Sequence, residues 1–186
     1  MNSNSKLFIG LVGTNGAGKS AVCEYLETKN FQVFSLSDIV REEAAKRNLE
    51  PNRDNLVWTG NLLKSLMGDN VLAKEAFQNA IQNEIPFTVF DSIRHTKEVE
   101  FFKNKGVFII GVDAPIKTRY ERIKKRKKDT DNVTFETFKE HDERENSGSS
   151  AGQAIKAALE LCDTLIDNSG TLSSLHKKID KALESH

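Results

Sequence analysis

The chain has 186 residues, enough for one domain that buries a full hydrophobic core without disulfides or metals. The 27 Lys and Arg residues balance 27 Asp and Glu residues, which excludes the broad positive field of a general nucleic-acid binder. No apolar run reaches membrane-spanning length, and the two cysteines lack the spacing of a metal or redox site. With no N-terminal signal pattern, we expect a cytoplasmic protein that does not bind membranes.

Short apolar runs alternate with longer segments of helical periodicity along the chain. The predicted strands are Leu7–Val12, Phe31–Leu36, Phe87–Phe90, Val107–Val112 and Thr164–Ile166. The last predicted helix covers Thr171–Glu184, with its apolar face formed by Leu172, Leu175, Ile179 and Leu183. Strands that alternate with helices predict an α/β fold, with a five-stranded parallel sheet and helices on both faces.

The first predicted strand leads directly into Gly13-Thr14-Asn15-Gly16-Ala17-Gly18-Lys19-Ser20. This is the P-loop pattern Gly-x-x-x-x-Gly-Lys-Ser, and a helical segment follows it without a gap, as the motif requires. Glycines let successive backbone N–H groups turn toward phosphate oxygens, and the helix N-terminus favours negative charge. Lys19 can reach the β- and γ-phosphates, and the Ser20 hydroxyl can bind Mg²⁺. The predicted phosphate-binding residues are Gly13, Asn15, Gly16, Ala17, Gly18, Lys19, Ser20 and Ala21.

The carboxyl ends of parallel strands are where ligands bind, and the second predicted strand is followed by Asp38 and Arg41. Asp38 can accept a proton from a hydroxyl acceptor or orient Mg²⁺-bound water, and it can also cap the following helix. Arg41 suits a phosphate group of a substrate. The alternative for Arg41 is a solvated side chain paired with Asp38, three positions earlier on the same helical face.

The third predicted strand is followed by Asp91 and Arg94. An acidic residue that ends a strand beside the P-loop strand is the Walker-B arrangement, in which Asp91 holds Mg²⁺. Arg94 can contact the phosphate of a second substrate. The alternative for Asp91 is a cap on the helix predicted to begin near Thr96.

The fourth predicted strand precedes a strongly basic helix in which Arg119, Arg122 and Arg126 recur at spacings of three and four and share a face. Arginines on a lid can neutralise a phosphoryl group during transfer, and we favour Arg122 and Arg126 for this role. The alternative is a solvated basic face.

Two predicted connections, residues 38–86 and 117–152, are longer than the sheet needs, which is typical of substrate-binding segments and lids. In the first, Arg53 is a candidate second phosphate ligand. Trp58 lies nearby and could stack on a base, although tryptophan is more often a core residue.

Together these motifs resemble the nucleoside-monophosphate-kinase-like branch of P-loop proteins. The chain is similar over nearly its whole length to dephospho-CoA-kinase-like and archaeal nucleotide-kinase-related P-loop proteins. Segment 37–42 is similar to the start of the monophosphate-binding region of adenylate-kinase relatives, and residues 91–94 are similar to their Asp-plus-Arg element with shorter spacing. The His-Pro and acidic Pro-Leu-Leu elements of authentic dephospho-CoA kinases are not found.

The resemblance implies a three-layer P-loop NTPase fold in a single domain, residues 1–186, with an acceptor-binding helical insertion at 38–86 and a lid at 117–152. It implies an ATP-dependent phosphotransferase that uses Mg²⁺ and acts on a nucleoside or deoxynucleoside monophosphate, with small nucleotides rather than nucleic acid as partners. Lys19, Asp38, Asp91, Arg122 and Arg126 would be catalytic, and Arg41, Arg53 and Arg94 would bind the acceptor. The metal ligands would be Ser20 and Asp91.

Two alternatives stay open at the level of sequence. A dephospho-CoA kinase would phosphorylate a ribose hydroxyl and would need a general base, for which Asp38 is the natural candidate. A regulatory nucleotide-binding module or NTPase would transfer phosphate to nothing but water. A nucleic-acid-associated ATPase that uses the basic helix is a third and weaker alternative.

Overall fold

The computed structural model describes residues 6–126, 133–146 and 154–185, and within these ranges it leaves out the side chains of residues 53 and 144–146. Five parallel strands form one sheet in the order β2-β3-β1-β4-β5. The strands are β1 (Leu7–Gly13), β2 (Gln32–Ser35), β3 (Phe87–Ile93), β4 (Phe108–Asp113) and β5 (Thr164–Asp167). The predicted five-stranded parallel sheet is therefore confirmed.

Eight of the described helices occupy the connections between strands, as a parallel topology requires, and the last one follows β5. In chain order the helices are α1 (Lys19–Glu27), α2 (Leu36–Lys46), α3 (Arg53–Met67), α4 (Val71–Gln82), α5 (Thr96–Lys103), α6 (Ile116–Arg126), α7 (Phe135–Asn146), α8 (Ile155–Glu160) and α9 (Leu172–Glu184). None of the described helices is long and apolar enough to cross a membrane.

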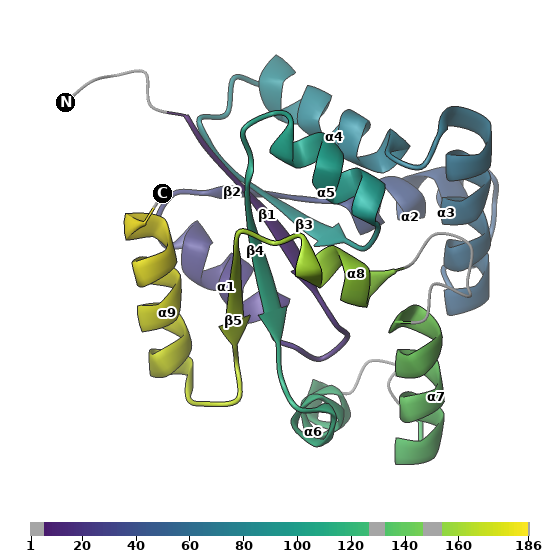
Figure 1. The fold of residues 1–186 in the computed structure, drawn as a ribbon. Helices are drawn as coiled ribbons and strands as arrows, with labels where there is room; N and C mark the ends of the chain where they lie inside the picture. The colour runs from purple at the N-terminus through teal and green to yellow at the C-terminus, as the bar shows by residue number, and fades with distance from the viewer. Residues whose placement is uncertain (1–5, 127–132, 147–153, 186) are drawn as a thin grey trace.

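Helices cover both faces of the sheet, and each face has its own apolar core (Figure 1). One core joins α1 and α9 to residues such as Ile9, Leu11 and Ile110 of the central strands. The other joins α2, α3, α4, α5 and α8 to Phe90 and its neighbours, and the Phe90 ring stacks on Phe102 with centroids 4.6 Å apart. The strand β1 is buried on both sides, which explains its continuous apolar sequence.

The carboxyl ends of the strands form the edge at which the chemistry-bearing residues gather. The P-loop begins at the end of β1, and α6 lies beyond the arrowhead of β4, beside α7 (Figure 1). The segment between β2 and β3 holds α2, α3 and α4, which pack on one another at the β2 side of the sheet. Parallel pairing thus places the P-loop between the residues that end β3 and those that end β4.

Two local expectations differ from the structure. The strand β3 continues to Ile93 instead of ending at Phe90, because a register shift against β1 lets pairing resume at Val12 and Ile93. In α9, the predicted apolar face is shifted: Leu175, Ile179 and Ala182 are buried, whereas Leu172 is exposed. The helix starts after Thr171, whose side chain accepts a hydrogen bond from the Ser174 backbone N–H, so Leu172 occupies the first turn outside the packed surface.

We predict that Leu11→Ala lowers the free energy of unfolding by about 2–5 kcal/mol, because it leaves a cavity between β1 and the helices α1 and α9. The matched control is Leu165→Ala on β5, where the side chain is 61% exposed and the expected loss is under about 1 kcal/mol. Urea unfolding of the two variants measures the difference, and equal losses would contradict the burial pattern.

Candidate active site

The P-loop runs from the end of β1 to the start of α1 at Lys19, and two of its glycines have positive φ. Gly16 has φ 78° and Gly18 has φ 104°, conformations that residues with a Cβ rarely adopt. A Cβ on Gly16 would lie 2.6 Å from the Arg119 carbonyl oxygen, and one on Gly18 would lie 2.3 Å from the Asn168 amide nitrogen. Glycine is needed here both for the turn and for close packing against α6 and the end of β5.

The Lys19 side chain folds back over the loop that precedes it. Its Nζ donates hydrogen bonds to the carbonyl oxygens of Gly13 at 2.6 Å and Thr14 at 3.3 Å. Ser20 follows in the first turn of α1, exposed at the cavity surface. An ammonium, a hydroxyl and the positive end of a helix therefore meet on one side of the loop, which suits a polyphosphate.

Side chains from two neighbouring strand ends hold the P-loop in place. Thr14 Oγ1 donates to Asp113 Oδ1 at the end of β4, at 2.7 Å. Asn168 follows β5, and its Nδ2 donates to the Ala17 carbonyl at 2.8 Å. Sequence reasoning missed both roles. The available signal was only the position of a polar residue at a strand end, because no spacing rule connects residues 14 and 113 or 17 and 168.

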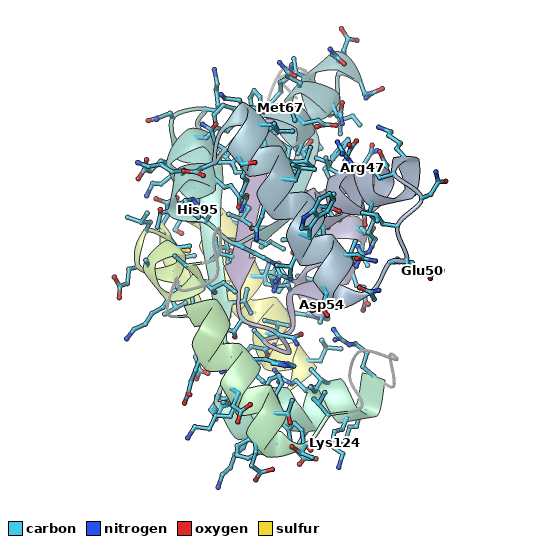
Figure 2. All side chains as sticks on the ribbon, turned by 90° about the vertical axis from the view of Figure 1, so that its right-hand side faces the viewer. Arg47, Glu50, Asp54, Met67, His95 and Lys124 are labelled. Atoms are coloured by element: carbon cyan, nitrogen blue, oxygen red, sulfur yellow. The ribbon has the colours of Figure 1, made fainter. Side chains whose placement is uncertain are left out.

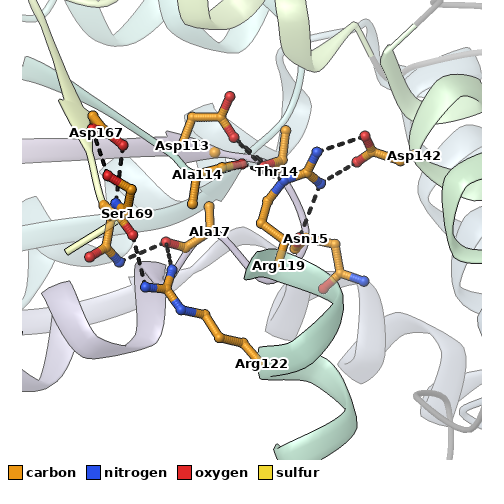
Figure 3. A network of polar contacts seen from close by, with 12 residues as sticks. Thr14, Asn15, Ala17, Asp113, Ala114, Arg119, Arg122, Asp142, Asp167 and Ser169 are labelled. Carbon is orange, nitrogen blue, oxygen red and sulfur yellow. Dashed lines mark hydrogen bonds and ion pairs between the residues drawn. The ribbon is translucent and has the colours of Figure 1, made fainter. Parts of the chain in front are cut away.

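The helix α6 contributes two arginines to the same network (Figure 3). The two differ in exposure. Arg122 lines the cavity and donates to the carbonyl oxygens of Ala17 at 3.2 Å and Asn168 at 2.8 Å. Arg119 is 5% exposed, and its guanidinium forms a two-pronged ion pair with Asp142 of α7, at 2.5 and 2.8 Å. Arg119 also donates to the Ala114 carbonyl. Although Arg119 and Arg122 share a face of α6, Arg119 is not among the described residues that line the cavity.

The end of β3 presents the Asp91 carboxylate to the cavity. Its Oδ2 accepts a hydrogen bond from Ser92 Oγ, whereas its buried Oδ1 has no hydrogen-bond partner among the residues that the structure describes. A buried carboxylate oxygen without a donor is costly unless a cation or a bound water satisfies it. Asp91 also affects Cys23 of α1: burial raises the pKa of this thiol to about 12, and the negative charge of Asp91 adds to the shift.

Asp91 and Ser20 fit a Mg²⁺ ion that is held mainly by nucleotide phosphates. Mg²⁺ prefers hard oxygen ligands and is typically bound through one or two protein groups plus substrate oxygens. Within the described ranges, no cluster of three or more His, Cys, Asp or Glu residues could bind a metal by protein ligands alone. The open Oδ1 of Asp91 and the exposed hydroxyl of Ser20 therefore match a Mg²⁺ site that is completed by substrate oxygens, and not one made of protein ligands alone.

Beyond Asp91, the cavity wall carries the two arginines predicted to bind a second substrate. Arg94 follows β3 and Arg41 lies on α2, and both line the cavity. Arg41 Nη1 contacts Asp38 Oδ1 at 2.8 Å and Ser37 Oγ at 3.0 Å. Asp38 is 62% exposed in the first turn of α2 and does not belong to the described lining, so its carboxylate turns toward Arg41 and solvent.

The cavity lining also contains a buried ion pair that the sequence analysis did not predict. Glu98 is 1% exposed and accepts the backbone N–H groups of Arg94 and His95 at 2.9 and 3.1 Å. Its other oxygen lies 3.4 Å from Nζ of Lys64 on α3, and both side chains line the cavity. Glu98 stands three residues after the helix cap His95, which is the capping-box spacing, but no sequence signal identifies Lys64.

One cavity of about 680 Å³ joins these elements, a size typical of small-molecule sites. Predicted site residues in its lining are Asn15, Gly16, Gly18, Lys19, Ser20, Ala21, Arg41, Asp91, Arg94, Arg122 and Arg126. Gly13 and Ala17 are buried behind the loop and are absent from the described lining. The side chain of Arg53 and the lid segments 127–132 and 147–152 lie outside the described part of the chain.

Trp58 does not reach this cavity in the described structure. It lies on α3, 52% exposed, and is not among the lining residues. Figure 2 shows α3 facing the viewer, with Asp54 and Met67 near its two ends. The face of α3 that meets the cavity instead carries Leu56, Gly60, Asn61 and Lys64, which follow the spacing of a helical stripe.

Comparison with known proteins identifies the family. A family described as "AAA domain" matches residues 9–147. The chain belongs to this family of P-loop proteins. It is also a UPF0200 protein by similarity: the UPF0200 protein of Thermococcus gammatolerans is 31% identical over 180 residues, which are 94% of this chain and 92% of that relative.

A second archaeal relative agrees with this assignment, and a solved structure agrees with the fold. The UPF0200 protein of Methanocaldococcus jannaschii is 31% identical over 96% of this chain and 89% of its own length. Shikimate kinase from Acinetobacter baumannii, solved in complex with shikimate, has a TM-score of 0.61 at 15% identity and covers 98% of this chain and 95% of its own. At this identity the likeness shows the fold alone. The predicted relation to archaeal nucleotide-kinase-related P-loop proteins and the three-layer P-loop fold are confirmed.

We predict that Asp142→Asn lowers the free energy of unfolding by about 3–5 kcal/mol, because it leaves the buried Arg119 charge without its carboxylate. The control on the same helix is Glu143→Gln, which alters an exposed pair with Lys139 and should have little effect. Thermal unfolding measures both, and a stable Asp142→Asn protein would show that the pair does not hold α7 against α6.

Proposed function

We propose that this chain transfers the γ-phosphoryl group of ATP to a nucleoside or deoxynucleoside monophosphate. The observation that carries the proposal is that one cavity is lined both by the P-loop lysine and by two arginines from separate elements, Arg41 and Arg94. Arginine suits phosphate because its planar fork donates to two oxygens at once. A second phosphate site within reach of the first is what a kinase of monophosphates requires.

The donor half would hold ATP through the backbone N–H groups of the P-loop and the Lys19 ammonium. Lys19 now donates to the Gly13 and Thr14 carbonyls, bonds that phosphate oxygens can replace with stronger charge-assisted ones. Ser20 and Asp91 would hold Mg²⁺, which supplies charge neutralisation across the β- and γ-phosphates. The open Oδ1 of Asp91 supports this role, because it is a buried anionic oxygen that lacks a protein donor in the described structure.

The acceptor half would hold the monophosphate between Arg41 and Arg94, with its sugar and base toward α3. On that side Leu56, Val57 and Leu72 supply apolar surface, and Asn61 and Lys64 supply hydrogen-bonding groups. Residues 38–86 would thus act as the acceptor-binding insertion, and Arg53 at the start of α3 is proposed as a further phosphate ligand. Trp58 is not proposed as a base-stacking residue, because its ring lies outside the cavity lining.

Transfer itself needs positioning and charge more than covalent chemistry. Arg122 is already fixed at the P-loop by the Ala17 and Asn168 carbonyls, and Arg126 lies one turn further along α6 at the cavity. We assign both to neutralisation of the phosphoryl group as it passes from donor to acceptor. The lid, residues 117–152, would carry them and exclude water during transfer.

A hydroxyl acceptor, as in dephospho-CoA kinase, has less support. It would need a general base, and Asp38 is exposed and paired with Arg41 instead of directed into the cavity. The decisive experiment is a screen with γ-labelled ATP against all common nucleoside and deoxynucleoside monophosphates and dephospho-CoA. Label on a monophosphate supports the proposal, and label only on dephospho-CoA or only on inorganic phosphate refutes it.

We predict that Lys19→Ala lowers kcat by about 10²–10³-fold, because it removes a cation aimed at the transferring phosphate. The fold should be retained, since Lys19 lines the cavity and donates hydrogen bonds to the Gly13 and Thr14 carbonyls of the P-loop. Steady-state kinetics with far-ultraviolet circular dichroism as the folding check measures this. Full turnover in the variant would refute the donor site.

We also predict that Arg94→Ala raises the KM for the monophosphate about tenfold or more and changes the KM for ATP by less than about twofold, because only the acceptor loses a charged partner. The control is Lys97→Ala, an exposed residue three positions on that pairs with Glu100. A change confined to ATP affinity would mean that the acceptor site lies elsewhere.

A further inference from the structure

The end of β3 contains a bulge next to the P-loop strand. Gly10 pairs with Phe90 and Val12 pairs with Ile93, so Asp91 and Ser92 together stand opposite the single residue Leu11. Successive side chains of a regular strand point to opposite faces, but here Asp91 and Ser92 both line the cavity. Bulges of this kind redirect side chains and are frequent beside active sites.

Ser92 adopts a conformation that disfavours its own side chain. Its φ is 67°, in the left-handed region, which costs a residue with a Cβ about 1 kcal/mol or more relative to glycine. Glycine would form the same bulge without this cost. Ser92 differs from glycine by a hydroxyl group, and this hydroxyl makes hydrogen bonds at the site.

The Ser92 hydroxyl is one link in a chain of hydrogen bonds that ends on Asp91. Ser92 Oγ donates to Asp91 Oδ2 at 3.1 Å and accepts from Ser35 Oγ at 3.2 Å, across the β2–β3 pair. Ser35 Oγ lies 2.9 Å from Ser37 Oγ, and Ser37 accepts from Arg41 Nη1 at 3.0 Å. Because Ser35 gives its one proton to Ser92, Ser37 is the donor to Ser35.

Every proton in this chain therefore points from the Arg41 guanidinium toward the Asp91 carboxylate. Hydrogen bonds aligned in one direction polarise one another and strengthen the last bond in the series. That last bond holds one carboxylate oxygen, Oδ2, and leaves the buried Oδ1 as the oxygen without a donor in the described structure. The Asp91 carboxylate is thus fixed in rotation with a single oxygen available.

We propose that Ser92 is a positioning residue that turns the Asp91 carboxylate so that Oδ1 alone serves the divalent cation of the bound nucleotide. The proposal rests on the proposed function, in which Asp91 takes part in the metal–nucleotide site. Ser92 acts through Asp91 and touches neither the metal nor the phosphates. Partners that orient a metal-binding carboxylate typically change metal affinity about 10–100-fold when they are removed.

The test compares Ser92→Gly and Ser92→Ala, which both remove the hydroxyl while only the first relieves the backbone. Mn²⁺ serves as a paramagnetic probe in place of Mg²⁺, titrated by electron paramagnetic resonance with a non-hydrolysable ATP analogue bound. We expect both variants to weaken Mn²⁺ binding about tenfold or more. We expect Ser92→Gly to have the higher Tm of the two, so that stability and metal affinity change independently.

Further variants separate positioning from a general structural effect. Ser35→Ala leaves the Ser92–Asp91 bond in place and should weaken Mn²⁺ binding less than either change at Ser92. Ser65→Ala removes an exposed hydroxyl whose hydrogen bond in the described structure is to the Leu62 carbonyl of its own helix, and it should leave Mn²⁺ affinity at the wild-type value. Binding of the nucleotide analogue in excess chelator should be the same in all variants, because the hydrogen bonds of these hydroxyls in the described structure do not involve the P-loop.

Wild-type Mn²⁺ affinity in Ser92→Gly would overturn the proposal, as would an equal loss of analogue binding in chelator. The outcome is separable from that of the proposed function. If the wild-type protein binds Mn²⁺ and the analogue but phosphorylates no monophosphate, the acceptor assignment fails while the Mn²⁺ comparison still decides the role of Ser92.

Discussion

The site depends on the contacts that hold the P-loop backbone in place. The P-loop turns through Gly16 and Gly18 in conformations that glycine adopts more readily than other residues. It is fixed from outside by Asp113 and Asn168 at the ends of β4 and β5 and by Arg122 of α6. Each partner binds Thr14 or a loop carbonyl, which leaves the inner surface of the loop available for phosphate.

The same contacts connect the P-loop to α6 and α7, which lie in the segment proposed as a lid. Arg122 bridges the Ala17 and Asn168 carbonyls, and one turn earlier Arg119 joins the end of β4 to Asp142 of α7. The buried Arg119 guanidinium has five N–H donors that need acceptors. The described acceptors are the carbonyl oxygens of Ala114 after β4 and Asn15 of the P-loop and the carboxylate of Asp142 on α7. The basic helix thus divides into a structural residue and cavity residues, although all belong to one charged face in the sequence.

Charge is separated locally in a chain whose formal net charge is zero. Lys19, Arg41, Arg94, Arg122 and Arg126 line the cavity, and the carboxylates in its described lining are those of Glu24, Asp91 and Glu98. Glu98 is already satisfied by two backbone N–H groups and by Lys64, whereas Asp91 keeps one oxygen open. That difference between two neighbouring carboxylates is what separates a structural acid from a candidate metal ligand.

The sequence alone determined the sheet, the P-loop and the neighbourhood of the site, for local reasons. The periodicity of strands and helices can be recognised from residues close together in the sequence, and the Gly-x-x-x-x-Gly-Lys-Ser pattern is one continuous motif. The residues that follow parallel strands lie at the same edge of the sheet. This is why the sequence alone predicts Arg41, Asp91 and Arg94 as residues of the site. Their roles in catalysis stay predictions.

Tertiary structure decided which of these side chains face the cavity and what holds them there. The burial of Arg119, the outward turn of Asp38, the Lys64–Glu98 pair and the hydroxyl chain through Ser35 and Ser92 all join residues from different elements. Such contacts depend on register and on the β3 bulge, and no spacing along the chain encodes them. A one-residue change in pairing redirects a side chain to the other face of a sheet, which the linear pattern does not reveal.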